Sequence, residues 1–127
     1  MKEDKKTLLL VEDDFESQRY MEVLLKQQYA LLYAESADEG RTLLDSKSID
    51  LILMDISLRG SEDGLDLTRQ LRRDPRFSHL PIIAVTAHAF PRDQHLCLQA
   101  GCDAYFSKPF SQGDLLRAIR DLLHQAN

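Results

Sequence analysis

The stretch Leu8-Leu9-Leu10-Val11-Glu12-Asp13-Asp14 joins a four-residue apolar run directly to three acidic residues. A similar pattern returns at Leu51-Ile52-Leu53-Met54-Asp55. Short apolar runs bounded by charged residues are typical of strands that are buried on both faces of a parallel sheet. In open parallel sheets, ligands bind at the carboxyl ends of the strands. We therefore expect the two acidic groups to meet at one edge of a sheet and to form a binding site.

Strand-like and helix-like patterns alternate five times along the chain. We expect strands at Thr7–Val11, Ala30–Ala34, Asp50–Met54, Pro81–Val85 and around Tyr105-Phe106, and helices at Phe15–Gln28, from Ala37 to about Ser46, at Leu65–Arg73 and after Ser111. Asp14 is a plausible N-cap of the first helix, and Tyr20, Met21, Leu24 and Leu25 share one face of it. This alternation predicts an α/β fold with a parallel sheet, right-handed crossovers and helices on both faces.

Length and composition limit the class of protein. A chain of 127 residues is the size of one domain. The net charge of −5 argues against nucleic acid or an anionic membrane as the main partner. The chain contains no apolar run long enough for a bilayer and no signal-peptide pattern, so we expect a cytoplasmic protein. Cys97 and Cys102 do not match the spacing of a zinc site, and we expect free, buried thiols.

The acidic residues themselves indicate a cation site. Two unit charges ~4 Å apart repel each other by about 4 kcal/mol at an effective dielectric constant of 20. A bound cation would offset this repulsion, and Mg²⁺ prefers hard oxygen ligands such as carboxylates. The sequence therefore predicts a magnesium site at the carboxyl edge of the sheet.

Four motifs stand at the ends of the expected strands one, three, four and five. They are Val11-Glu12-Asp13-Asp14, Leu53-Met54-Asp55-Ile56, Val85-Thr86-Ala87 and Tyr105-Phe106-Ser107-Lys108-Pro109-Phe110. In this order they closely resemble the receiver domain of two-component response regulators, from about Thr7 to Leu123. The resemblance implies a flavodoxin-like, doubly wound, five-stranded parallel sheet of strand order 2-1-3-4-5. We expect residues 1–127 to be one receiver domain without an output domain.

The resemblance also implies roles for the acidic residues. Asp55 is similar to the phosphoryl acceptor, and Glu12 and Asp13 are similar to the paired acids that bind Mg²⁺. Asp13 and Asp55 would be direct ligands, and Glu12 would act through water. The backbone carbonyl of Ser57 would be a further ligand.

The remaining motifs resemble the residues that respond to phosphorylation. Lys108 is similar to the cation that pairs with the phosphoryl group, and its bond to Pro109 is usually cis in this family. Thr86 is similar to the hydroxyl that follows the phosphoryl group, and Tyr105 to the aromatic rotamer switch. Neutralisation of phosphoryl charge by Mg²⁺ and an ammonium group is the chemistry that such a transfer needs.

The implied function is that of a single-domain signalling module. It accepts a phosphoryl group from a phosphohistidine of a histidine kinase or phosphotransfer protein, and then changes its contact with a downstream protein effector. Beyond its own Mg²⁺-dependent phosphorylation and dephosphorylation, no enzyme activity is expected. The altered surface would include parts of Arg92–Gln99, Tyr105 and Gln112–His124, and phosphorylation could also drive dimerisation through it.

Two departures from the family pattern concern residues near the acceptor. Many receivers carry proline four residues after the acceptor and glycine eight after it, whereas this chain has Arg59 and, one residue later than usual, Gly64. This puts partner specificity in doubt. The second departure is His88, two residues after Thr86. We hypothesise that Ser57 and His88 flank the path of the attacking water and set the lifetime of the phosphorylated state.

Two other readings lack a feature that they need, and two remain as alternatives. A phosphohydrolase of the haloacid dehalogenase type needs an aspartate where Ser57 stands. A flavin- or nucleotide-binding module needs a glycine-rich phosphate loop where acids follow the first strand. A receiver excised from a hybrid kinase or longer regulator, or a phosphorylation-independent interaction module, would carry the same motifs. The basic residues Arg69, Arg72, Arg73 and Arg76 are interpreted as a solvated face.

Overall fold

The computed structural model describes residues 5–56, 64–87 and 91–125. Within these ranges the elements are β1 (Thr7–Val11), α1 (Phe15–Leu25), β2 (Ala30–Ala34), α2 (Ala37–Ser46), β3 (Leu51–Met54), α3 (Gly64–Arg73), β4 (Ile82–Thr86), α4 (Pro91–Ala100), β5 (Ala104–Ser107) and α5 (Gln112–Gln125). The strands form one parallel sheet of order β2-β1-β3-β4-β5, which confirms the predicted fold class. Of these helices, none combines the length and the apolar character needed to span a bilayer.

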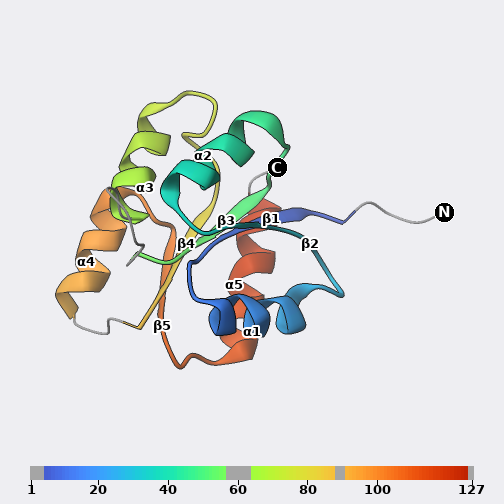
Figure 1. The fold of residues 1–127 in the computed structure, drawn as a ribbon. Coiled ribbons are helices and arrows are strands. Elements are labelled where there is room, and N and C mark those ends of the chain that lie inside the picture. Colours follow the sequence, from blue (N-terminus) through green and yellow to red (C-terminus); the bar gives the residue numbers. More distant parts are fainter. Residues whose placement is uncertain (1–4, 57–63, 88–90, 126–127) are drawn as a thin grey trace.

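The helices form two layers on the sheet (Figure 1). Helices α2, α3 and α4 cover one face, and α1 and α5 cover the other. Successive side chains of a strand point to opposite faces. Accordingly, Leu9, Ile52 and Ile82 belong to the core under α2–α4, while Leu10 and Leu53 belong to the core under α1 and α5. The apolar runs lack polar alternation because both faces of β1, β3 and β4 are buried.

The first helix differs from its prediction in two respects. It ends at Leu25 rather than Gln28, because the N–H groups of Gln28 and Tyr29 both bond to the Leu25 carbonyl in a turn toward β2. Tyr20 is 45% exposed rather than buried. Its ring packs edge-on against Phe110 at 6.0 Å. The N-cap is confirmed, since the Asp14 carboxylate accepts a 2.8 Å hydrogen bond from the N–H of Ser17.

The interpretation of Arg72 as a solvated residue is wrong. Its guanidinium, with the side chain only 19% exposed, donates to the carbonyl of Gly101 at 2.9 Å and to that of Leu80 at 2.7 Å. It also forms an ion pair with Asp103 at 2.9 Å. Arg72 therefore ties α3 to the segments that precede β4 and β5. Arg73, one residue later, is exposed as predicted.

The two cysteines are free and buried, as predicted. They stand at the end of α4, where Gly101 has φ 120° and the Cys102 N–H bonds to the Cys97 carbonyl at 3.0 Å. This backbone pattern is that of a Schellman motif, which commonly brings an apolar contact between these two positions. Burial raises the pKa of Cys97 to about 12 and that of Cys102 to about 11, so both remain protonated thiols at neutral pH.

Candidate functional site

Three carboxylates converge at the carboxyl edge of the central strands. Glu12 and Asp13 follow β1, Asp55 follows β3, and these two strands are neighbours in the sheet. One oxygen from each carboxylate lies within 4.8 Å of the others. The Asp55 N–H bonds to the Val11 carbonyl at 2.9 Å, which continues the strand ladder up to the site. The parallel register therefore brings together the acids that the sequence placed there.

Glu12 is the most strongly perturbed of the three acids. It is 8% exposed. Burial, followed by a hydrogen bond with Asp55, raises its pKa from 4.5 to about 7, although Lys108 acts in the opposite direction. Glu12 therefore retains its proton until about neutral pH, mainly because burial disfavours its charged form. The cluster carries more negative charge than its protein neighbours offset.

We expect Glu12→Gln to stabilise the metal-free protein more at about pH 8 than at about pH 5. The raised pKa means that the folded protein binds this proton more tightly than the unfolded chain does. The stability that Glu12 contributes is thus fully present below pH 4.5, and it is lost as the pH rises through about 7. Urea unfolding in EDTA at both pH values measures the difference.

Glu16→Gln is the matched control, because Glu16 is an exposed acid in the first turn of α1. Its effect should be the same at both pH values. Added Mg²⁺ should stabilise the wild type at the higher pH more than the Glu12→Gln variant, since a ligand that binds the folded state raises its stability. A Glu12→Gln effect that does not change with pH would contradict the raised pKa.

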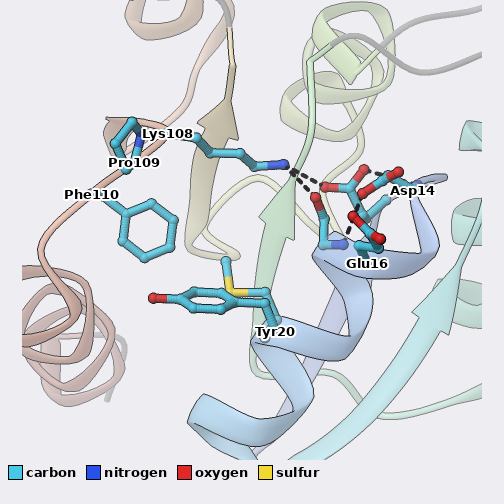
Figure 2. Close-up of a pocket in the computed structure, with 9 residues that line it drawn as sticks. Asp14, Glu16, Tyr20, Lys108, Pro109 and Phe110 are labelled. Carbon is cyan, nitrogen blue, oxygen red and sulfur yellow. Dashed lines mark hydrogen bonds and ion pairs between the residues drawn. The ribbon is translucent and has the colours of Figure 1, made fainter.

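Lys108 reaches the acidic cluster from the end of β5, the edge strand of the sheet. It follows β5, and its N–H bonds to the Thr86 carbonyl at 2.8 Å. Its Nζ lies 3.0 Å from Glu12 Oε1 and 3.0 Å from Ser17 Oγ (Figure 2). The Lys108–Pro109 bond is cis, as the resemblance implied. The site thus combines carboxylates with one ammonium group, all from strand ends or the first turn of α1.

A cavity of about 320 Å³ opens beside Lys108, between the start of α1 and the segment after β5. Its lining includes the N-cap Asp14 and Glu16 at the start of α1, and the rings of Tyr20 and Phe110 (Figure 2). Of the site residues, Glu12 and Lys108 border this cavity.

Thr86 and Tyr105 stand on adjacent strands beside the site. Thr86 is the last residue of β4 and is fully buried. Tyr105 is half-buried against the core under α2–α4. Burial, with smaller contributions from Cys97 and Asp93 of α4, raises the pKa of Tyr105. By strand alternation Thr86 points to the same face as Ala84, which belongs to that core, so both side chains point to the α4 side.

Ser57 and His88 lie outside the described residues, as does the segment between Ile56 and Gly64. The predictions for them stay predictions.

Two features of the site were not predicted from the sequence. Ser17 contacts Lys108, from which it is separated by 91 residues. Gln18 donates to the backbone carbonyl of Glu12 at 2.6 Å. Both are polar residues of the first helical turns, and a solvated helix surface was the natural expectation for them. No motif or spacing marks them, because the Ser17 contact depends on where the segment after β5 places Lys108, and the Gln18 contact depends on how the chain turns from β1 into α1.

Gly64 explains one departure from the family pattern. A Cβ atom at this position would lie 2.9 Å from Met54 Cγ and closer still to the Asp55 carbonyl oxygen. Side chains essentially never come this close, so the start of α3 can approach the end of β3 only without a side chain. The displaced glycine thus permits the close approach of α3 to the end of β3.

Gly64→Ala is expected to destabilise the protein by about 1–3 kcal/mol, because backbone around Asp55 has to shift. The urea midpoint at constant slope measures this loss. Gly113→Ala is the control, since a Cβ there meets only Ser111 Oγ at 3.9 Å and alanine favours the helix. Equal stability of the two variants would show that the approach at Gly64 is not constrained.

The comparisons with known proteins agree with this geometry. The family model for the response regulator receiver domain matches residues 8–120. The chain belongs to the response regulator receiver family. The receiver is 34% identical to the polar-differentiation response regulator DivK of Brucella ovis, a match that covers 95% of this chain and 98% of DivK.

Solved receiver structures share the fold. One is a CheY-like response regulator receiver domain protein from Methanospirillum hungatei JF-1, 28% identical, with a TM-score of 0.86 and coverage of 97% of both chains. Another is the receiver domain of the sensor histidine kinase PA1611 from Pseudomonas aeruginosa PAO1, 32% identical, with a TM-score of 0.85 and coverage of 94% of this receiver and 98% of that chain. That structure has a magnesium ion coordinated in its active site cleft. This receiver is thus a signalling module of two-component systems.

Proposed function

We propose that this receiver accepts a phosphoryl group on Asp55 from a phosphohistidine of a histidine kinase or phosphotransfer protein. The observation that carries the proposal is the cluster of Glu12, Asp13 and Asp55, with oxygens within 4.8 Å, beside the Lys108 ammonium. An anionic nucleophile in a cluster that also holds a cation suits transfer of a phosphoryl group.

Mg²⁺ is the cofactor in this proposal. Asp13 and Asp55 would be direct ligands, with Glu12 acting through water and the Ser57 carbonyl as a further ligand. The donor set fits, because it consists of three carboxylates whose oxygens lie within 4.8 Å of one another, and carboxylate oxygens are ligands that Mg²⁺ prefers. When bound, the ion supplies positive charge to the phosphoryl oxygens and to the acceptor.

The proposed reaction is a displacement at phosphorus. A carboxylate oxygen of Asp55 forms a bond to phosphorus, the phosphorus–nitrogen bond of the phosphohistidine breaks, and the imidazole leaves with its electron pair. Lys108 contributes an ammonium N–H to an oxygen of the group in transfer. The product is an acyl phosphate, and attack of water on phosphorus later returns the carboxylate and inorganic phosphate. No activity beyond this cycle is proposed.

The response to phosphorylation is assigned to Thr86 and Tyr105. Both side chains point to the α4 side of the sheet, which supports a path from the site to the surface of α4, β5 and α5. The Thr86 hydroxyl would contact the phosphoryl group and Tyr105 would fill the space that it leaves. A downstream protein effector, or a second copy of the chain in a phosphorylation-dependent dimer, would bind this surface.

Ser57 and His88 are proposed to set the lifetime of the acyl phosphate, on the basis of their positions in the sequence. The autodephosphorylation rate of His88→Ala tests this idea, and a rate within about twofold of the wild type would end it.

Residues 1–127 are proposed to form one receiver domain in the cytoplasm. The family match over residues 8–120 and the single sheet support the domain assignment. Free thiols at Cys97 and Cys102 support a reducing compartment.

Intact mass after incubation with acetyl phosphate tests the central proposal. A gain of one phosphoryl group that requires Mg²⁺, and is abolished by EDTA, is expected. No gain under any condition would overturn it in favour of a phosphorylation-independent interaction module.

A further inference from the structure

The Lys108 ammonium has two protein acceptors from different parts of the chain. One is the Glu12 carboxylate at 3.0 Å, and the other is the Ser17 hydroxyl at 3.0 Å. Figure 2 shows the Lys108 side chain extended from the segment after β5 toward the start of α1. These two hydrogen bonds therefore fix the position of the Lys108 ammonium between Glu12 and the start of α1.

The first turn of α1 holds Ser17 in place. The Ser17 N–H donates to the Asp14 carboxylate at 2.8 Å, and the Asp14 N–H donates in turn to Glu12 Oε2 at 3.1 Å. The Gln18 side chain donates to the Glu12 carbonyl at 2.6 Å. This network connects the helix start to Glu12, so the two acceptors of Lys108 have a constant separation. Ser17 can thus orient the ammonium as well as contact it.

The chemistry of the two acceptors differs in a useful way. The Glu12 carboxylate attracts the ammonium, but it also offsets part of the charge that a phosphoryl group would use. The Ser17 hydroxyl is neutral, so it accepts one N–H without reducing the net positive charge. A lysine ammonium has three N–H groups, and Glu12 and Ser17 accept from two of them.

We propose that Ser17 is a positioning residue for phosphoryl transfer to Asp55, and that it acts through Lys108. Its hydroxyl holds the ammonium beside the acidic cluster, so that the third N–H is directed to an oxygen of the phosphoryl group. This inference rests on the proposed function, because it assumes that Asp55 is the acceptor and that Lys108 contacts the transferred group.

The proposal predicts an effect on the rate of transfer rather than on donor binding. Lysine side chains have much rotational freedom, and an ammonium that is already oriented loses less of it in the transition state. Partial loss of the hydrogen bond from the Lys108 ammonium to Ser17 corresponds to a rate decrease on the order of five-fold. The acetyl phosphate concentration at half-maximal rate should not change.

The test compares Ser17→Ala, Ser17→Thr, Lys108→Ala and the double variant Ser17→Ala/Lys108→Ala. Initial rates of phosphorylation are measured by intact mass over a range of acetyl phosphate concentrations at saturating Mg²⁺. Alanine favours helices more than serine does, so Ser17→Ala should fold, and urea unfolding verifies this. Ser46→Ala is the matched control, because Ser46 is an exposed helical serine whose hydroxyl bonds only within α2 among the contacts described. Calorimetric titration with Mg²⁺ gives a readout independent of phosphorylation.

The expected result has three parts. Ser17→Ala lowers the maximal rate about five-fold, Ser17→Thr restores it, and Ser17→Ala has no further effect in the Lys108→Ala background. Ser17→Ala should bind Mg²⁺ with the affinity of the wild type. The control Ser46→Ala should be phosphorylated at the wild-type rate. A wild-type rate for Ser17→Ala, or an equal loss in the Lys108→Ala background, would overturn the positioning role while leaving the proposed function intact. Absence of phosphorylation in the wild type would instead overturn the proposed function itself.

Discussion

Replacement of Asp55 by Asn is expected to abolish the gain of a phosphoryl group that acetyl phosphate and Mg²⁺ produce in the wild-type receiver. A carboxamide has no anionic oxygen to form the acyl phosphate. The variant also removes one of the three carboxylates that lie within 4.8 Å of one another, which weakens the cation site. Intact mass of both proteins, measured side by side, gives the result directly.

Asp121→Asn is the matched control, because Asp121 is an exposed acid of α5 far in sequence from the site. This variant should gain the phosphoryl group as the wild type does. Asp13→Asn should also fail to gain it at low Mg²⁺, since Asp13 is a proposed ligand rather than the acceptor, and higher Mg²⁺ should restore part of the reaction. A normal gain in Asp55→Asn would move the acceptor to another residue.

Replacement of Arg72 by Ala is expected to lower the free energy of unfolding by about 3 kcal/mol. The variant removes hydrogen bonds to the carbonyls of Gly101 and Leu80 and the ion pair with Asp103. The partly buried carbonyls would be left without these donors, and the apolar stem of Arg72 would leave a gap beside Gly101. Urea unfolding at constant slope measures the loss.

Arg73→Ala serves as the control, because Arg73 is the neighbouring arginine and is exposed. It should change stability by less than about 0.5 kcal/mol. Arg72→Lys should recover only part of the loss, since an ammonium cannot contact these carbonyls and Asp103 with the planar geometry of a guanidinium. Equal stability of Arg72→Ala and Arg73→Ala would show that the contacts of Arg72 contribute nothing net.

The fold could be predicted because its determinants are local and periodic. The apolar runs of β1, β3 and β4 are continuous, and strand patterns alternate with helix patterns, which leaves a parallel sheet as the consistent solution. Positions directly after such strands are brought to one edge by the register alone. Glu12, Asp13 and Asp55 therefore came together as predicted, and Lys108 joined them as the family resemblance implied.

Element ends and single-residue environments were less predictable. Gln28 has a helix-compatible side chain, and only the turn toward β2 ends α1 at Leu25. Tyr20 lies four residues before Leu24, which is a helical spacing, but its ring packs against Phe110 and stays 45% exposed. Sequence periodicity gives the direction of a side chain, whereas the neighbours on other elements decide whether solvent remains in contact with it.

The sequence by itself determined the order of elements, the parallel sheet and the set of acids at its carboxyl edge, because these follow from hydrophobic periodicity and the direction of strands. The tertiary structure alone decided three further features: the burial that raises the pKa of Glu12, the enclosure of Arg72 by backbone carbonyls, and the contact of Ser17 with Lys108. Each depends on distances between segments that are far apart in the chain. Desolvation and hydrogen bonding act over a few ångströms in space, and separation along the sequence does not report that distance.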